Sequence, residues 1–379
     1  MVQFFDAAAP FAVVPSERSG SARYSRQVAL PRFGTAAQQR LSDARVLIIG
    51  AGGLGSSVIP ALAAYGVGTI GIIDDDRVEL SNLHRQLIHG YADVGSPKAT
   101  SAAAAIAAID KTTIVQVHRE RLTSRIALDL FAGYDLVIDG SDNFPTRYLA
   151  NDAASISGIP LVWGAVSQYS GQVGVAWAER GPQYRDLFPT PPPVGTVLSC
   201  EAGGVLPSVV AVIGSIMTGE AIKILTEIGT PLIGRVTTYD SLSGAFRQLS
   251  YERDPSAAPI TQLIDYDLFC GASGSEITVE EFAPALGSTQ ILDVREPWEA
   301  AIASLPGSIL VPLGSLDAAL DGPIPGLDIG QPIVIYCHSG IRSSTAVQIL
   351  RSHGVTTARS LDGGIDAWSR RIDPAVARY

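Results

Sequence analysis

Residues 46–55 read VLIIGAGGLG, and an acidic cluster begins at Asp74. A short apolar run that enters a glycine turn and then a helix forms a phosphate-binding site, because glycines let the backbone approach an anion and the amides of the helix start face it. Asp74 follows Gly55 by 19 residues, where an acidic side chain holds a ribose hydroxyl in such folds. The stretch predicts an adenine-nucleotide site and leaves NAD and ATP as alternatives.

Strand and helix patterns alternate outward from this turn. Such alternation predicts a doubly wound, Rossmann-like α/β domain with a mostly parallel sheet, and we place it at residues 23–250, after an N-terminal arm at 1–22. Its expected strands lie at 45–50, 69–73, 113–117, 135–139, 160–163, 171–177 and 235–249.

A second α/β pattern occupies the C-terminal part of the chain. The polar stretch 251–275 is expected to be a linker, and residues 276–379 a smaller domain. Its expected elements are strands at 289–293 and 333–336 and a helix at 343–352.

Composition excludes several classes of protein. The net charge of −10 lacks the basic face that nucleic-acid binding requires. Three distant cysteines imply no disulfide framework. The first fifteen residues make a poor signal peptide, and no uninterrupted apolar run reaches the ~18 residues that span a membrane; the longest candidate is 205–217. We therefore expect a cytoplasmic protein that binds neither membrane nor nucleic acid.

Cationic residues near the turn favour ATP over NAD. Arg85 follows the acidic cluster, and Lys98 opens a helix after Gly95-Ser96-Pro97. A triphosphate that is about to be cleaved needs more positive charge than a dinucleotide, because charge builds on the transferred and leaving groups. The P-loop pattern GxxxxGK[ST] is absent from the sequence, which argues against a P-loop kinase or ATPase.

Ser141-Asp142-Asn143 follows the expected strand at 135–139. A carboxylate at the carboxyl end of a sheet strand lies where α/β proteins bind ligands, and Asp142 beside ATP phosphates would suit Mg²⁺. The alternative is an Asx turn or a helix N-cap before Pro145. The residues alone favour the cap.

Together these motifs resemble a known family. RYSRQ (23–27), GAGGLGS (50–56), DDDRVELSNLHRQ (74–86), GSPK (95–98) and SDN (141–143) are similar to the MoeB/ThiF branch of the E1-like activating enzymes. The resemblance implies a homodimer that uses ATP and Mg²⁺ to adenylate the C-terminal Gly-Gly carboxylate of a ubiquitin-like sulfur-carrier protein.

The same resemblance implies roles for single residues. Arg26 would act as an arginine finger supplied by the other subunit, and Asp142 would bind Mg²⁺ with Asn143 beside it. Asp74 would hold the ribose, and Lys98 would neutralise phosphate. The remaining nucleotide-site residues would be Gly50, Gly52, Gly53, Gly55, Asp76, Asn82, Arg85 and Gln86.

The cysteines depart from the family pattern at one point and match it at another. Many members hold zinc with two CxxC pairs, but here the first pair would fall at 183–186 and the second within 253–271, where Cys270 is the single cysteine. One cysteine without a suitable histidine cannot build a tetrahedral site, so we expect no zinc. Cys270 is expected to be a small buried residue. Cys200 matches the position of a candidate reactive thiol, with burial under a crossover loop as the alternative.

A second reactive centre is predicted at Cys337. The expected strand at 333–336 runs into CHSGIRS (337–343) and then a helix. A thiol at that position faces loop amides, and the helix dipole and Arg342 both favour the thiolate. Such a pocket can hold a persulfide or an oxyanion.

The pattern CxxGxRS resembles the active loop of rhodanese domains. LDVREPWE (292–299), LPGSILVPL (305–313) and LDGGIDAW (361–368) occur in the rhodanese order. The related Cdc25-type phosphatases place the arginine one residue further from the cysteine. Arg342 at the fifth position after Cys337 therefore favours sulfur over phosphate.

The two halves together are similar to the MoeZ-type members, in which an adenylation domain is fused to a rhodanese domain. This implies sulfur transfer from a Cys337 persulfide to the activated carrier, giving a thiocarboxylate, with thiosulfate or a cysteine desulfurase as the donor. Participation of Cys200 and the pathway served (molybdopterin, cysteine, thiamine or a secondary metabolite) stay open. The alternatives are an NAD-dependent oxidoreductase and a non-catalytic carrier-binding scaffold.

Overall fold

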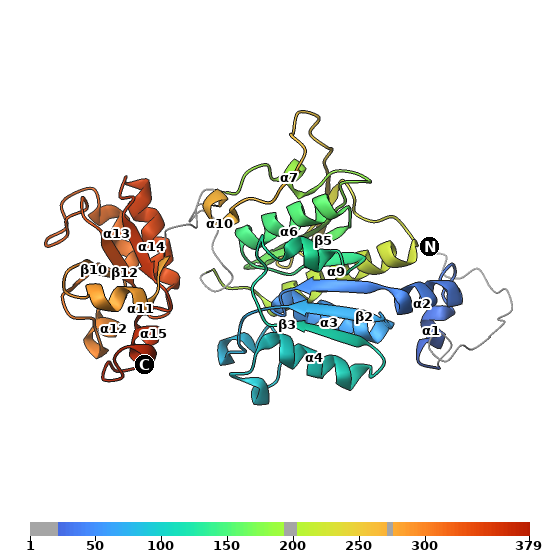
Figure 1. Ribbon diagram of the computed structural model, residues 1–379, viewed down its shortest axis with the longest axis horizontal. Helices are drawn as coiled ribbons and strands as arrows, with labels where there is room; N and C mark the ends of the chain where they lie inside the picture. Colours follow the sequence, from blue (N-terminus) through green and yellow to red (C-terminus); the bar gives the residue numbers. More distant parts are fainter. Residues whose placement is uncertain (1–21, 193–202, 271–275) are drawn as a thin grey trace. The chain divides into compact units, whose positions relative to one another are not determined.

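The computed structural model describes residues 22–192, 203–270 and 276–379 (Figure 1). The chain forms two compact units: one holds most of the described residues before Tyr266, and the other holds Tyr266–Tyr379. Each unit is built on its own sheet.

The first unit contains an eight-stranded sheet with the order β3-β2-β1-β4-β5-β6-β7-β8. The strands from β3 to β5 run parallel, and β6, β7 and β8 continue the sheet antiparallel. All the strands expected here are confirmed, and 235–249 divides into a hairpin. Their bounds are β1 (Arg45–Ile49), β2 (Thr69–Ile73), β3 (Ile114–His118), β4 (Leu136–Asp139), β5 (Leu161–Ser167), β6 (Ser170–Ala176), β7 (Arg235–Asp240) and β8 (Ala245–Ser250).

Helices cover both faces of the parallel part of this sheet (Figure 1). Val46, Ile48 and Ile70 belong to a core cluster with α2, α3, α4 and α9. Because side chains alternate along a strand, Leu47 points to the opposite face, where α6 packs on β4 and β5 and α5 packs on α6. The helices are α1 (Ser25–Val28), α2 (Gly34–Asp43), α3 (Gly53–Tyr65), α4 (Lys98–Ile109), α5 (Ala127–Phe131), α6 (Phe144–Ser157), α7 (Tyr184–Leu187) and α9 (Pro207–Thr226), with 3-10 turns η1 (Ala22–Tyr24), η2 (Leu80–Asn82) and η3 (Tyr91–Asp93).

Helix α9 is longer than the apolar stretch 205–217 that the sequence singled out. It has the length and hydropathy of a membrane-spanning helix, and half of its most apolar window is buried within the unit. Val209, Ile213 and Met217 pack in the core cluster. The helix also carries the buried acidic residue Glu220. Its carboxylate has a partner within the unit, because it accepts a hydrogen bond from the amide of Leu232 at 2.8 Å.

The second unit contains a five-stranded parallel sheet with the order β11-β10-β12-β13-β9. Separate apolar clusters pack on its two faces, one around Leu292 and Ile335 and the other around Ile291 and Val334. The expected strands at 289–293 and 333–336 are confirmed. The strands are β9 (Glu276–Ile277), β10 (Gln290–Asp293), β11 (Ser308–Leu310), β12 (Ile333–Tyr336) and β13 (Ala358–Leu361).

The expected helix at 343–352 is confirmed as α14 (Ile341–Ser352), two residues longer at its start. Cys270, at the end of α10 (Tyr266–Phe269), is buried as expected. The other helical elements of this unit are α11 (Val279–Phe282), η4 (Ala283–Ala285), α12 (Pro297–Ile302), α13 (Leu313–Ala319) and α15 (Gly364–Arg371).

Candidate active sites

The glycine turn joins β1 to α3 at the carboxyl edge of the sheet. Gly50 has φ +89°, and a Cβ there would lie 3.3 Å from the carbonyl oxygen of Gly140. A Cβ on Gly55 would collide with the carbonyl oxygen of Gly50. These two positions therefore require glycine. Helix α3 begins at Gly53, and its first amides have no intrahelical acceptor, so they are available to an anion.

Asp74, at the end of β2, is hydrogen-bonded to this turn. Its Oδ2 accepts from the amide of Ala51 at 2.7 Å, and its Oδ1 accepts from the amide of Asp76 at 2.8 Å. Burial raises the pKa of the Asp74 carboxyl. The structure thus brings the predicted ribose-binding acid and the predicted phosphate cradle together.

Lys98 and Asp76 form an ion pair beside the turn. The Nζ of Lys98 lies 2.7 Å from Oδ2 of Asp76, and the amide of Lys98 donates to the carbonyl of Asp76 at 2.9 Å. Lys98 is the first residue of α4 and its side chain is buried. The lysine is therefore held in one place, at the start of a helix.

The segment between Asp76 and Lys98 carries three other side chains that were predicted to line the nucleotide site. The Oδ1 of Asn82 accepts from the amide of Glu79 at 3.1 Å, and Arg85 donates to the carbonyl of Ser81 at 3.0 Å. Gln86 is buried, and its Oε1 has no hydrogen-bond partner within the described residues. The Gln86 amide lies 3.6 Å from the position of a Cβ on Gly52. A buried carboxamide oxygen without a donor beside the turn fits a ligand that donates a hydrogen bond there.

His89 supports the turn, and the sequence interpretation missed it. Its Nε2 lies 2.9 Å from the carbonyl oxygen of Ala51, and its Nδ1 lies 2.8 Å from Oγ of Ser101. Burial lowers the pKa of this imidazole. Because a carbonyl only accepts, the neutral ring carries its proton on Nε2 and receives the Ser101 hydroxyl on Nδ1. No local sequence pattern signals this contact, which joins residues 38 apart.

A buried ion pair fixes the loop that carries Asp142. Asp139 ends β4, and its Oδ1 accepts from the amide of Ser141 at 2.9 Å. Arg147 lies 3.5 Å from the other oxygen of Asp139 and donates to the carbonyls of Ser141 and Gly164, each at 2.8 Å. Asp139 and Arg147 were also absent from the predicted site. Together they set where the Ser141-Asp142-Asn143 loop lies.

The helix-cap alternative applies to Asn143. Its Oδ1 accepts from the amide of Thr146 at 2.9 Å and caps α6. Asp142 precedes the cap, and its side chain is exposed at the carboxyl end of β4. The cap role of Asn143 leaves the Asp142 carboxylate available to a cation.

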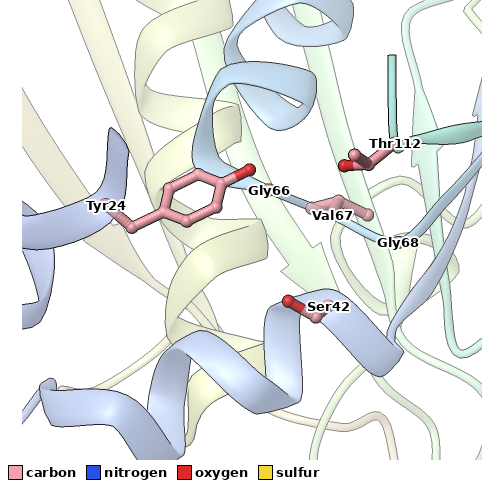
Figure 2. Close-up of a pocket in the computed structure, with 6 residues that line it drawn as sticks. All are labelled: Tyr24, Ser42, Gly66, Val67, Gly68 and Thr112. Atoms are coloured by element: carbon pink, nitrogen blue, oxygen red, sulfur yellow. The ribbon is translucent and has the colours of Figure 1, made fainter. Parts of the chain in front are cut away.

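Arg26 lies at the opposite end of α3 from the glycine turn. The preceding Tyr24 donates to Oδ2 of Asp110 at 2.8 Å, and Gln27 donates to the carbonyl of Tyr65 at 3.1 Å. Figure 2 shows the Tyr24 ring beside Gly66, in a small cavity that is also lined by Ser42, Val67, Gly68 and Thr112. The twelve helical steps of α3 separate the two ends by about 18 Å. Within one copy of the chain, Arg26 is therefore not brought to the turn.

Cys200, which the sequence also predicted as a site residue, lies outside the described residues. A polar network occupies residues 183–186 and part of 253–271, the positions at which the family resemblance would place zinc ligands. Arg185 on α7 lies 2.6 Å from Asp152 on α6, and the amide of Asp254 donates to Asp186 at 3.0 Å. These contacts join three segments by side-chain hydrogen bonds.

In the second unit, Cys337 follows β12 at the start of a loop that leads into α14. Its Sγ accepts from the amide of Gly340 at 3.2 Å, and Oγ of Ser343 lies 3.6 Å away. Gly340 has φ +97°, a conformation that favours glycine. The amide of Ile365, at the start of α15, donates to the carbonyl of Cys337 at 2.9 Å. The LDGGIDAW motif thus binds the start of the loop by a backbone hydrogen bond. The thiol of Cys337 is buried within the loop.

Arg342 makes a contact that the sequence interpretation missed. Its Nη1 and Nη2 lie 2.6 Å from the two carboxylate oxygens of Glu299, in a bidentate pair. The hydrogen bonds from Arg342 lower the pKa of Glu299 to about 2. Glu299 ends the LDVREPWE motif, which was the only sequence signal for it. Arg342 lies at the loop as predicted, but its charge is already compensated.

Comparisons with known proteins agree with this division. The profile of the ThiF family matches residues 24–259, and that of the rhodanese-like domain matches residues 278–371. The chain is 44% identical over 378 residues to the probable adenylyltransferase/sulfurtransferase MoeZ of Mycobacterium tuberculosis (strain CDC 1551 / Oshkosh), covering 96% of each chain.

Two further curated relatives and a solved structure extend the comparison. The sulfur carrier protein adenylyltransferase of Thermus thermophilus is 48% identical over 261 residues, covering 66% of this chain and 96% of that one. The adenylyltransferase and sulfurtransferase MOCS3 of Drosophila ananassae is 39% identical over 387 residues, covering 94% and 85%. A crystal structure of E. coli MccB with ATP matches at a TM-score of 0.57 and 20% identity, covering 65% of this chain and 77% of that one. This last likeness shows the fold alone.

Proposed function

The chain belongs to the ThiF family and carries a rhodanese-like domain, and from this premise we propose that it adenylates a ubiquitin-like sulfur-carrier protein at its C-terminal Gly-Gly carboxylate and then converts that carboxylate into a thiocarboxylate. It is an adenylyltransferase and sulfurtransferase, as its full-length relatives are named. One observation carries the proposal: a glycine turn with Asp74 bound to it and a loop that buries the Cys337 thiol lie in separate units of one chain. We assign the first activity to residues 23–250, the second to 276–379, and a linker to 251–275.

The glycine-turn site has the groups that ATP requires. The free amides at the start of α3 would receive phosphate, and Asp74 would hold the ribose. The unpaired carboxamide oxygen of Gln86 would accept a hydrogen bond from a hydroxyl or amino group of the nucleotide. Arg85 and Lys98 would add positive charge. The exposed Asp142 carboxylate would hold Mg²⁺, which neutralises phosphate charge when bound.

Adenylation turns a poor electrophile into a good one. A carboxylate oxygen of the carrier attacks the α-phosphorus of ATP, the bond to the β-phosphate oxygen breaks, and pyrophosphate leaves. The protein contributes by positioning the two reactants and by compensating the charge that builds on the leaving group. Lys98 suits this task because its buried stem fixes where its charge lies.

The Cys337 loop would then supply sulfur. The outer sulfur of a Cys337 persulfide attacks the acyl carbon, and AMP leaves with the electron pair, which gives an acyl disulfide. A second thiol attacks the Cys337 sulfur, so that the carrier leaves as a thiocarboxylate and a disulfide forms on the enzyme. Cys200 is one candidate for that thiol, and an external thiol is the other. A cysteine desulfurase or thiosulfate would reload Cys337.

We also propose that the protein acts as a homodimer. Arg26 is exposed on α1, far from the turn of its own copy. Four large apolar side chains are exposed on the segment that joins Asp76 to Lys98: Leu80, Leu87, Tyr91 and Val94. A second copy that covers this surface would bury them and bring its own Arg26 to the phosphates.

We further propose that the protein holds no structural zinc and does not bind nucleic acid. The polar network between α6, α7 and Asp254 supports the expectation that no zinc is needed to hold these segments together. The acidic net charge supports a protein that does not bind nucleic acid. We propose a cytoplasmic location.

Carrier-dependent exchange between ATP and labelled pyrophosphate tests the adenylation half directly. The purified chain should catalyse exchange only when a Gly-Gly carrier is present, and a carrier lacking its last glycine is the matched control. Exchange without any carrier, or no exchange with any of the Gly-Gly carriers of the same organism, would refute the proposal.

A further inference from the structure

The charge of the Cys337 loop is unusual for a site that is expected to receive an anionic sulfur donor. Arg342 is the cation nearest the thiol in the loop sequence, and both of its terminal nitrogens are bound to Glu299. A bidentate arginine–carboxylate pair fixes geometry as well as charge. The pair presents no net charge to a ligand that enters the loop.

Glu299 is held in this position from three sides. Besides Arg342, it accepts from the amide of Glu296 at 3.0 Å and from the hydroxyl of Tyr379 at 3.1 Å. Its side chain is almost completely buried, whereas that of Arg342 is one-third exposed. A ligand at the loop could therefore recruit Arg342 only by leaving a buried carboxylate unpaired, which is costly.

Among the described residues, what remains to attract an anion is the loop backbone, the start of α14 and the imidazole of His338, whose buried Nδ1 has no hydrogen-bond partner. The amide of Gly340 already donates to the thiol sulfur, and α14 is a twelve-residue helix whose dipole favours negative charge at its N-terminus. These groups suit a single negative charge, such as the outer sulfur of a persulfide. They compensate poorly for a free dianion, whose sulfonate group needs a cation of its own.

We propose that Glu299 sets the donor specificity of the Cys337 loop: by compensating Arg342 it disfavours thiosulfate and selects a cysteine persulfide. This inference rests on the proposed sulfur transfer and names its donor class. The Cys337 thiolate attacks the outer sulfur of the donor persulfide, the donor S–S bond breaks, and the donor thiolate leaves. With thiosulfate the same attack releases sulfite, so both reactions balance without an oxidant or reductant. Glu299 acts through Arg342 and is a positioning residue.

The test compares two donors on the full-length protein. The rate of sulfur loading on Cys337 is measured by intact-protein mass spectrometry with thiosulfate and with cysteine persulfide as probes. Wild-type protein should load from cysteine persulfide at a much higher kcat/KM. Glu299→Gln should raise kcat/KM for thiosulfate about tenfold or more, since it frees a charge-assisted donor, and should change the persulfide value little.

Two further variants isolate the cause. Glu296→Gln removes a negative charge from the residue that caps α12, without removing the partner of Arg342, and should leave the donor ratio unchanged. In an Arg342→Ala background, Glu299→Gln should no longer favour thiosulfate. A role limited to folding would lower loading from both donors equally, so the donor ratio distinguishes the two roles.

Each outcome decides a different claim. Equal loading of the wild-type protein from both donors would overturn the inference alone, and this comparison needs no variant to fold. A folded Glu299→Gln protein without a gain on thiosulfate would overturn it as well. Absence of sulfur on Cys337 from either donor would overturn the proposed sulfur transfer itself.

Discussion

Each of the two sites holds a cationic side chain in an ion pair with a carboxylate. In the first site the carboxylate is the exposed member of the pair, and in the second site it is the buried one. Lys98 is 9% exposed and its partner Asp76 is 65% exposed, with 2.7 Å between them. Arg342 is 34% exposed and its partner Glu299 is 6% exposed, with 2.6 Å between them. An exposed carboxylate is replaced easily by an incoming phosphate, because water can solvate it as it leaves. A buried carboxylate cannot leave at comparable cost. The first site is therefore ready for a polyanion, and the second is not.

Removing the nucleotide-site cation should have the largest effect. Lys98→Ala should lower the rate of carrier-dependent ATP–pyrophosphate exchange by about a hundredfold to a thousandfold, as loss of a fixed charge at a reacting centre does. Sulfur loading of Cys337 should be unchanged, because it needs no phosphate. Asp76→Asn, which leaves the lysine in place, should cost much less. Equal losses in the two variants would break the comparison, since both members of the pair would then be needed.

The second test concerns a cation supplied from outside the site. Arg26→Ala should reduce exchange by about a hundredfold, although α1 lies far from the turn in its own copy. Mixing Arg26→Ala with Asp142→Ala protein should restore about a quarter of the wild-type rate, because half of the random dimers then contain one intact site. No recovery after subunit exchange would place Arg26 outside the reaction of a partner copy.

The third test addresses the glycine turn itself. Gln places its amide nitrogen near the position of a histidine Nε2, and Asn does not. His89→Gln should therefore keep the hydrogen bond to Ala51, whereas His89→Asn should lose it and weaken ATP binding about tenfold. Calorimetric Kd values for ATP would show the difference. Equal weakening in both variants, with equal loss of thermal stability, would reduce His89 to a packing residue.

The smallest effect concerns acid stability of the second unit. The pKa of Glu299 is about 2 in the folded protein, below its unfolded value, so its contribution is fully present above about pH 4.5 and is lost as pH falls toward 2. Between pH 5 and 3.5, the urea midpoint should therefore fall less steeply in Glu299→Gln than in wild type. Identical slopes would mean that the pair with Arg342 adds nothing to stability.

Features that depend on neighbouring residues in the sequence could be predicted, and features that depend on contacts between distant residues could not. The strands were predictable because buried parallel strands read as continuous apolar runs, and Gly50, Asp74 and Cys337 were predictable because they directly follow such runs. His89 and Glu299 were not. Their partners Ala51 and Arg342 lie 38 and 43 residues away, and only the tertiary fold brings them together.

The roles of single residues divided in the same way. Whether Asp142 or Asn143 caps α6 depends on one hydrogen bond that the sequence left open, and the structure gives it to Asn143. Arg342 was expected to favour the thiolate, a role that its pair with a buried carboxylate now weakens. Motif recognition located the side chains, but it could not predict which of their charges are already compensated.

The central claim is that one chain activates a carboxylate and then places sulfur on it, and the mass of the carrier tests this most directly. Wild-type protein with ATP, a Gly-Gly carrier, a persulfide donor and a reducing thiol should convert the carrier terminus from carboxylate to thiocarboxylate. Cys337→Ala should keep full pyrophosphate exchange and yield no thiocarboxylate, and Cys270→Ala is the matched control that should behave as wild type. Thiocarboxylate formed at the wild-type rate by Cys337→Ala would contradict the account.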